Sequence, residues 1–174
     1  NVQLGGQGLI VTRGKQHPGR IVLPMLSGAE GRNLYLLISD DNGRQWKRIG
    51  PLAGETNKGP ELLEDAGGVL WVATGPQSGE GKFRMVISSK DGGDTWSEPT
   101  MSSMQDANTR GSLALGQDAS DQPVWYYASS GVVTDENGGI FRTHLTLFGS
   151  RDEGKTWTEL RRMHFGAWSY PTVV

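Results

Sequence analysis

The sequence predicts an all-β fold made of about three repeated blocks, each of four short antiparallel strands. One motif, S-x-D-x-G-x-x-W, recurs at Ser39–Trp46, Ser89–Trp96 and Ser150–Trp157, at spacings of 50 and 61 residues. Self-similarity at such a period is typical of repeat architectures with one supersecondary unit per repeat. No segment shows sustained apolar periodicity of the helical kind, so we expect little helix.

The repeated motif has the composition of a hairpin turn that folds on itself. In the first copy, the Ser39 and Asp41 side chains are expected to hydrogen-bond nearby backbone groups, as in Asx-type turns. Gly43 permits a positive φ, and Trp46 is expected to return over the turn and bury a large apolar surface. Because the motif occurs once in each block, we interpret it as a structural staple rather than as a set of metal ligands or catalytic acids.

Strand-like runs, separated by clusters of Gly, Pro, Asp and Asn, fill each block. The first block contains Leu9–Thr12, Arg20–Leu26, Leu34–Ser39 and Trp46–Ile49; the second contains Glu61–Leu63, Val69–Thr74, Phe83–Ser88 and a short piece after Trp96; the third contains Ser112–Gly116, Val124–Ala128, Thr143–Phe148 and Trp157–Arg161. Four-stranded blocks of about 50 to 60 residues are typical of β-propeller blades.

The block boundaries predict a single partial β-propeller domain over 1–174. Its blades cover approximately 1–54, 55–105 and 106–165, and a further blade starts at 166–174. A propeller closes its ring so that no blade keeps a bare face. We therefore expect this chain to be part of a larger propeller, or a half-ring that self-associates or binds its missing half. It starts without Met or a signal peptide, as a mature form or a piece of a longer chain would.

Composition narrows the function classes. Gly accounts for 26 of 174 residues, about twice the usual share, as many tight turns require. A net charge of −2 without a basic face argues against a nucleic-acid partner. The absence of Cys excludes thiolate sites, and the three His residues lack metal-ligand spacing, so we expect no metal and no cofactor. No apolar run is long enough to cross a membrane as a helix.

Several segments resemble the sialidase family, six-bladed propellers that remove terminal sialic acids from glycans. The repeated motif is similar to that family's Asp box, and GRIVLP at Gly19–Pro24 is similar to its G-R-L-V-V-P strand. TRGSL at Thr109–Leu113 resembles C-x-G-S-[IL], and FRTHLTLFGSRDEGKTW at Phe141–Trp157 resembles R-x-N-L-T-V-x-x-S-x-D-x-G-x-T-W. WSYPTVV at Trp168–Val174 resembles G-x-x-A-Y-S-x-L. The resemblance covers nearly the whole chain and implies about three to three and a half blades of a sialidase-like propeller with Asp-box hairpins.

The resemblance also implies roles for two residues. Arg142 stands where the family has an arginine of the triad that holds the sialic acid carboxylate, and Tyr170 stands where it has the catalytic nucleophile. Guanidinium groups bind carboxylates through paired, directional hydrogen bonds. A neutral tyrosine avoids the repulsion that a carboxylate nucleophile would meet at an anionic sugar. Sialylated or other glycans are the implied partners, and a secreted, periplasmic or extracellular location is favoured.

The chain departs from the family pattern at two positions. When GPELLEDAGGVL at Gly59–Leu70 is aligned on E-P-x-V-V-E-L-x-D-G-x-L, Gly59 stands where the family has the glutamate that takes the tyrosine proton. Gly75 falls where the second triad arginine is expected. The first arginine and the acid aspartate of the family are expected upstream of Asn1. As a partial replacement for the glutamate, Glu61 lies two residues further on, on the same strand face.

Arg84 and Arg110 are the candidates for a second substrate-binding cation. Four of the candidate site residues also have a purely structural interpretation. They are Glu61 as a surface carboxylate, Arg110 as a turn residue, Arg142 as a solvated strand-entry residue, and Tyr170 as a half-buried strand tyrosine.

The aromatic residues Trp71, Trp125 and Tyr126–Tyr127 fit core or inter-blade packing better than a sugar platform. We expect Arg142 and Tyr170 to open toward one pocket on the axial side, away from the Asp boxes. Two function classes stay open. One is a sialidase-like glycoside hydrolase, of which this chain alone is inactive; the other is a non-catalytic Asp-box propeller that binds glycans or proteins.

Overall fold

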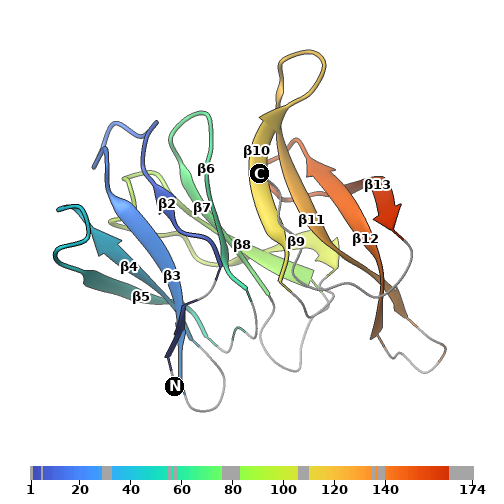
Figure 1. Ribbon diagram of the computed structural model, residues 1–174, viewed down its shortest axis with the longest axis horizontal. Helices are drawn as coiled ribbons and strands as arrows, with labels where there is room; N and C mark the ends of the chain where they lie inside the picture. The colour runs from blue at the N-terminus through green and yellow to red at the C-terminus, as the bar shows by residue number, and fades with distance from the viewer. Residues whose placement is uncertain are drawn as a thin grey trace.

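The fold is all-β, as the sequence predicts, and consists of three antiparallel sheets (Figure 1). The computed structural model describes residues 2–4, 6–28, 33–54, 56, 59–75, 83–105, 110–134, 136 and 140–164. Within these ranges no helix has the length and apolar composition that a membrane crossing needs.

Each sheet follows the order of the chain. The first sheet contains β1 (Val2–Leu4), β2 (Leu9–Ile10), β3 (Ile21–Ser27), β4 (Asn33–Ser39) and β5 (Lys47–Ala53). The second contains β6 (Glu61–Glu64), β7 (Leu70–Thr74), β8 (Phe83–Ser89) and β9 (Thr100–Gln105). The third contains β10 (Ser112–Gln117), β11 (Pro123–Thr134), β12 (Ile140–Ser150) and β13 (Thr158–His164).

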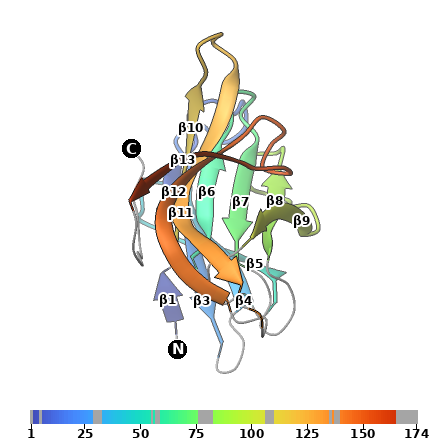
Figure 2. The ribbon, with the colours of Figure 1, turned by 90° about the vertical axis from the view of Figure 1, so that its right-hand side faces the viewer.

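The three sheets stand side by side as blades of an open propeller, with the innermost strands β2, β6 and β10 in contact (Figure 1). In the first blade the innermost position is shared, because β1 pairs with one half of β3 and β2 with the other. Gly6, at φ +67°, lies between β1 and β2, a backbone conformation that interrupts an extended strand. Figure 2 shows the third sheet from its outer side, where β11 and β12 run as a long curved pair. They extend well beyond the predicted strands.

The three Asp boxes lie in the turns that join the last two strands of each sheet, β4 to β5, β8 to β9 and β12 to β13, and all three form the same network. In the second box, Ser89 Oγ donates to Asp91 Oδ1 over 2.7 Å and accepts from the Gly93 amide over 2.8 Å. Asp91 Oδ1 accepts from the Thr95 amide, and Trp96 Nε1 donates to the Gly93 carbonyl over 3.1 Å. The glycine takes the positive φ that the motif predicts, +96°. The boxes are therefore turn staples.

The box tryptophans differ in burial. Trp96 and Trp157 are partly buried because each packs into a core shared with the preceding sheet. Trp46 is 42% exposed, so the expectation that it buries a large apolar surface is wrong. The second and third box turns pack against the sheet before them: an added Cβ at Gly92 would lie 2.8 Å from the Gln16 carbonyl oxygen, and one at Gly154 would lie 3.4 Å from Cγ1 of Val86. Among the described residues no sheet precedes the first box, which leaves its indole without that cover.

Two apolar cores fill the spaces between the sheets. The core between the first and second sheets includes Val22, Leu36, Leu62, Leu70 and Ile87. The core between the second and third sheets includes Leu63, Val86, Trp71, Trp125 and Tyr127. The rings of Trp71 and Trp125 meet edge to face, with centroids 5.0 Å apart, which confirms the packing role predicted for these tryptophans.

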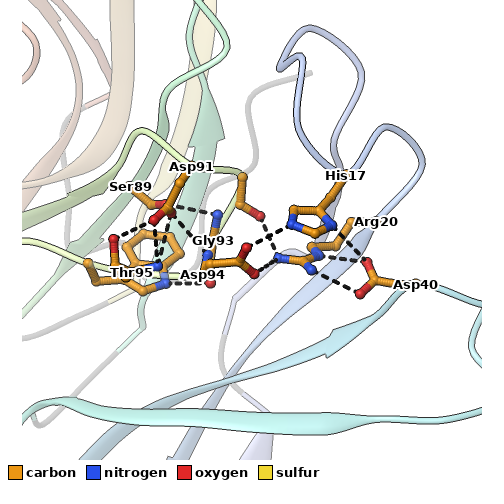
Figure 3. A network of polar contacts seen from close by, with 10 residues as sticks. His17, Arg20, Asp40, Ser89, Asp91, Gly93, Asp94 and Thr95 are labelled. Atoms are coloured by element: carbon orange, nitrogen blue, oxygen red, sulfur yellow. Dashed lines mark hydrogen bonds and ion pairs between the residues drawn. The ribbon is translucent and has the colours of Figure 1, made fainter.

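Charged groups tie the first sheet to the second. The Arg20 guanidinium, 3% exposed, bonds Asp40 of its own sheet and reaches Asp94 and the Gly92 carbonyl in the second Asp box (Figure 3). Nε2 of His17 also lies 2.8 Å from Oδ2 of Asp94.

A second polar contact joins the same two sheets, and here the second sheet supplies the charged side chain. The buried Glu64 carboxylate accepts the backbone amides of Thr12, Arg13 and Gly14, at 2.9, 2.7 and 2.7 Å. Burial acts to raise the pKa of this carboxyl, but the bonds from the Thr12, Gly14 and Arg13 amides hold it below its ordinary value. Glu64 therefore holds a loop of the first sheet against the second.

Candidate functional site

The described candidate residues lie at the ends of the second and third sheets that point away from the Asp boxes. Glu61 is the first residue of β6, and Arg142 is the third residue of β12, whose opposite end, Ser150, begins the third box. Arg110 precedes β10 by two residues. In an antiparallel sheet the starts of the first and third strands lie at the same end, so these residues share one end of the molecule.

Alternation along β6 decides which residues face which neighbouring sheet. Glu61 and Leu63 pair with Ala73 and Trp71 on the side of the core shared with the third sheet. Leu62 and Glu64 face the first sheet, as the contacts of Glu64 with its loop require. The Glu61 side chain thus leaves β6 on the side of the third sheet, and its Oε2 also lies near Gly6 of the first blade, 3.7 Å from where a Cβ would stand there.

Glu61 is a buried, ionisable group, 5% exposed. Desolvation by burial raises its pKa to about 7, although the charges of Arg84 and Arg110 act in the opposite direction. A carboxyl that titrates near neutral pH can take up and release a proton under ordinary conditions, which is the property of a general base. Burial rules out the reading of Glu61 as a surface carboxylate.

Arg84 lies on β8 on the same side as Glu61 and is buried, 3% exposed. Its Nη2 donates to the Gly59 carbonyl over 2.9 Å, and its guanidinium lies over the Tyr127 ring, 5.0 Å from the centroid. These contacts join the start of β6 to the third sheet through a cation–π pair. In this arrangement Arg84 holds the site together; the substrate contact suggested for it stays a prediction.

Gly59 and Arg110 fit together closely. Gly59 has φ +44°, and a Cβ added there would lie 2.8 Å from Cγ of Arg110. The half-buried Arg110 side chain therefore occupies the space that a side chain at position 59 would need. A glutamate would therefore fit poorly at position 59, while the alignment of Gly59 with the family glutamate stays a prediction. Gly75, the other departure, directly follows β7 and is buried.

Arg142 is half-buried and lies beside a β-bulge. Leu145 pairs with Ser130 and Arg142 pairs with Val132, so β12 carries one more residue than β11 between these pairs. The register pairs Arg142 with Val132 of β11. The structure thus brings Glu61, Arg84 and Arg110 together and places Arg142 at the same end of the third sheet.

Tyr170 and the remainder of WSYPTVV lie outside the described residues, so the pocket shared by Tyr170 and Arg142 stays a prediction. In the part of the chain that the structure describes, no cluster of His, Asp and Glu could hold a metal ion. Sequence reasoning missed the Tyr127 ring and the Gly59 carbonyl as partners of Arg84. No motif marks them, because both contacts depend on how two sheets pack.

Comparison with known proteins agrees with this architecture. The family model described as BNR repeat-like domain matches residues 3–174. The intramolecular trans-sialidase from Ruminococcus gnavus, solved with oseltamivir carboxylate, superposes with a TM-score of 0.73 at 20% identity, over 98% of this chain and 37% of that one. The Hadza microbial sialidase Hz136 gives a TM-score of 0.67 at 20% identity, over 94% and 31%. The NanB sialidase from Streptococcus pneumoniae gives 0.66 at 18% identity, over 95% and 24%.

At these identities the structural matches show a shared fold, and this chain spans well under half the length of each of these proteins. No curated protein sequence matches it. The family model, in contrast, runs over almost every residue and includes all three Asp boxes. The chain belongs to the family of BNR repeat-like domains and is a sialidase-related, partial β-propeller.

Proposed function

We propose that this chain supplies part of a sialidase-like site that binds terminal sialic acids of glycans. The observation that carries the proposal is the buried Glu61 carboxyl, with a pKa of about 7, beside Arg84 and Arg110 at the sheet end where Arg142 also lies. Arg142 and Arg110 are assigned to the substrate carboxylate, since guanidinium groups bind carboxylates with directional hydrogen bonds. Glu61 is assigned as the base for Tyr170.

The chemistry assigned to these residues is a nucleophilic displacement. Glu61 accepts the phenolic proton of Tyr170, the phenolate forms a bond to the anomeric carbon, and the aglycone leaves with the bonding electron pair and a proton. The proton for the leaving group comes from a general acid, for which the chain offers no assigned residue. The clamp on the carboxylate is also incomplete, because Gly75 replaces the second arginine. We therefore infer that the 174 residues alone bind sialic acid but do not hydrolyse sialosides.

Calorimetric titration with free N-acetylneuraminic acid tests the binding part of the proposal. Arg142→Ala and Arg110→Ala should each weaken binding about tenfold or more, because each removes a charge-assisted hydrogen bond. The matched control is Arg161→Ala, which removes an exposed arginine from β13 and should leave binding unchanged. Binding that is equally strong in Arg142→Ala and Arg110→Ala would overturn the assignment.

A second candidate function is favoured by the packing of Gly59 against Arg110. A site in which the position of the family glutamate is closed by an arginine side chain is suited to holding an acidic sugar or peptide without cleaving it. This non-catalytic propeller would bind the same acidic ligand and would show no turnover in any longer form of the chain. Activity in a longer form would exclude it.

A further inference from the structure

We propose that a pocket between the second and third sheets binds a neutral sugar ring. The cavity has a volume of about 280 Å³ and is lined by residues of β9 on one side and of β11, β12 and β13 on the other. It shares no lining residue with the cluster of Glu61, Arg84 and Arg110. This volume lies at the small end of ligand pockets and suits a single pyranose ring.

The aromatic wall of the pocket is held rigidly. Trp157 Nε1 donates to the Gly154 carbonyl over 2.8 Å, and the backbone amide of Trp157 donates to Ser103 Oγ over 3.0 Å. The indole also meets the Tyr127 ring edge to face, with centroids 5.8 Å apart. Phe148 lines the pocket beside it. Because its N–H is already bonded, the indole can offer an apolar face, which packs well against the C–H face of a sugar ring.

The bulge in β12 fixes a polar side chain at the pocket. Thr143 and His144 together oppose Gly131 of β11. An added Cβ at Gly131 would lie 2.8 Å from His144 Nε2, so the imidazole lies directly over the glycine. Any larger residue at 131 would displace it. Bulges commonly re-aim a side chain next to a binding site, and this one brings the imidazole of His144 to the lining of the pocket.

A second bulge brings an ion pair to the pocket. Phe148 and Thr146 of β12 pair with Glu159 and Arg162 of β13, which leaves Leu160 as part of the bulge. Residues three apart in a regular strand point to opposite faces, but here Glu159 and Arg162 share one face, and Arg162 Nε donates to Glu159 Oε1 over 2.7 Å. Arg161, between them, pairs with Leu147 on the other face.

The chemistry of the ion pair selects the ligand class. The two charges cancel, so the lining does not favour an anionic ligand. A carboxylate accepts hydrogen bonds and a guanidinium donates them, and neighbouring sugar hydroxyls both donate and accept. Together with an aromatic wall, this set matches a neutral hexose rather than sialic acid. The proposal does not depend on the sialic acid site, because none of the residues assigned to that site lines this pocket.

Titration of the chain with lactose, followed by NMR or calorimetry, tests the proposal. We expect saturable binding in the millimolar range, weakened about tenfold in Arg162→Ala through loss of charged hydrogen bonds, and weakened also in His144→Ala. Arg161→Ala is the matched control, exposed on the same strand but facing the other side, and should bind as the unaltered chain does. Circular dichroism of each variant verifies that it is folded.

Two results would overturn the proposal. One is the absence of saturable lactose binding, or binding that is the same in Arg162→Ala and His144→Ala as in the control. The other is displacement of lactose by a similar concentration of N-acetylneuraminic acid, together with loss of the binding of both sugars in His144→Ala. That result would make the pocket an acidic-sugar site. Loss of sialic acid binding in Arg142→Ala with lactose binding retained supports two separate sites.

Discussion

Arg20 Nη1 donates to Asp94 Oδ1 over 2.7 Å, which joins the first sheet to the Asp box of the second. The same guanidinium bonds both carboxylate oxygens of Asp40, at 2.7 and 2.9 Å, and the Gly92 carbonyl at 2.9 Å. These bonds raise the pKa of Arg20 and lower those of Asp40 and Asp94, chiefly through the side-chain hydrogen bonds between them. The Asp box of the second blade therefore stabilises its own turn and also holds the second blade against the first.

Removing Arg20 should separate the first two blades. Arg20→Ala removes a buried guanidinium from two carboxylates that are about half exposed, so it should lower the free energy of unfolding by about 2 kcal/mol. Arg20→Lys keeps the charge but loses the paired geometry, so it should recover only part of the stability. Urea denaturation measures both. Arg44→Ala, which removes an exposed arginine from the first box turn, is the control. A loss below about 1 kcal/mol in Arg20→Ala would show that the docking depends on the apolar core alone.

The unequal burial of the box tryptophans predicts unequal costs of truncation. Trp96→Ala removes a ring packed against the core of the first two sheets and should cost about 3 kcal/mol. Trp46→Ala removes a ring that is 42% exposed and should cost about 1 kcal/mol. Thermal or urea unfolding of the two variants checks the difference. Equal costs would mean that the turn hydrogen bond, common to both boxes, supplies the stability.

Much of the fold follows from local signals, because strand pairing in each blade joins neighbours along the chain. The strands of the second and third sheets begin within a few residues of the predicted ones. The long β11–β12 pair was predicted too short, because Ser129 and Ser130 interrupt the apolar pattern although both are buried. Sequence pattern alone cannot distinguish a buried serine in a strand from a serine in a loop.

The site could be predicted only in part. A motif match was enough to single out Glu61 and Arg110, but their closeness to each other and to Arg84 depends on how the second and third sheets pack. The positive φ of Glu153, +62°, directly before the box glycine, is also not predicted from the sequence. Sequence spacing predicts the turn, whereas a conformation that side chains rarely adopt at that position is set by the closed hydrogen-bond network around it.

Glu61 predicts a pH dependence of stability. Its pKa in the folded chain, about 7, lies above the ordinary value of 4.5, so the folded chain binds the extra proton. The contribution of Glu61 to stability is therefore full below about pH 4.5 and is lost as the pH rises through about 7, a fall of up to about 3 kcal/mol. Glu61→Gln should remove this fall and be more stable than the unaltered chain at pH 8. Urea unfolding at pH 5 and pH 8 provides the measurement.

Glu64 supplies a control of opposite sign. Because its folded pKa is lowered, its contribution is present above the unfolded pKa and is lost as the pH falls through the folded one. Glu64→Gln should therefore destabilise most at neutral pH, where Glu61→Gln stabilises. If both variants shift stability in the same direction at pH 8, the environment assigned to Glu61 is wrong.

The open arrangement of the blades predicts association. Large apolar side chains on the edge and outer strands are exposed: Ile10 is 57%, Met101 56% and Leu160 45% accessible. Apolar surface of this kind on an unclosed propeller should be covered by further blades or by a second copy of the chain. Sedimentation velocity over a range of concentrations should show reversible oligomers. Leu160→Lys should shift the distribution toward monomer, and a clean monomer at high concentration in the unaltered chain would contradict the prediction.

Hydrolysis of a fluorogenic sialoside is the decisive test of the proposed function. We expect no turnover by the 174-residue chain, because a nucleophile without a general acid and a complete carboxylate clamp loses most of its acceleration. Gly59→Glu should not create activity, since φ is +44° there and an added Cβ lies 2.8 Å from Arg110 Cγ. Combining it with Arg110→Ala removes the Cγ contact but leaves Cα and Cβ of residue 110 at 3.2 and 3.3 Å, and it also removes a guanidinium assigned to the substrate, so the double variant should stay inactive. Turnover by the unaltered chain that disappears in both Tyr170→Phe and Glu61→Gln would replace the inactive assignment with a working site in which Glu61 is the base.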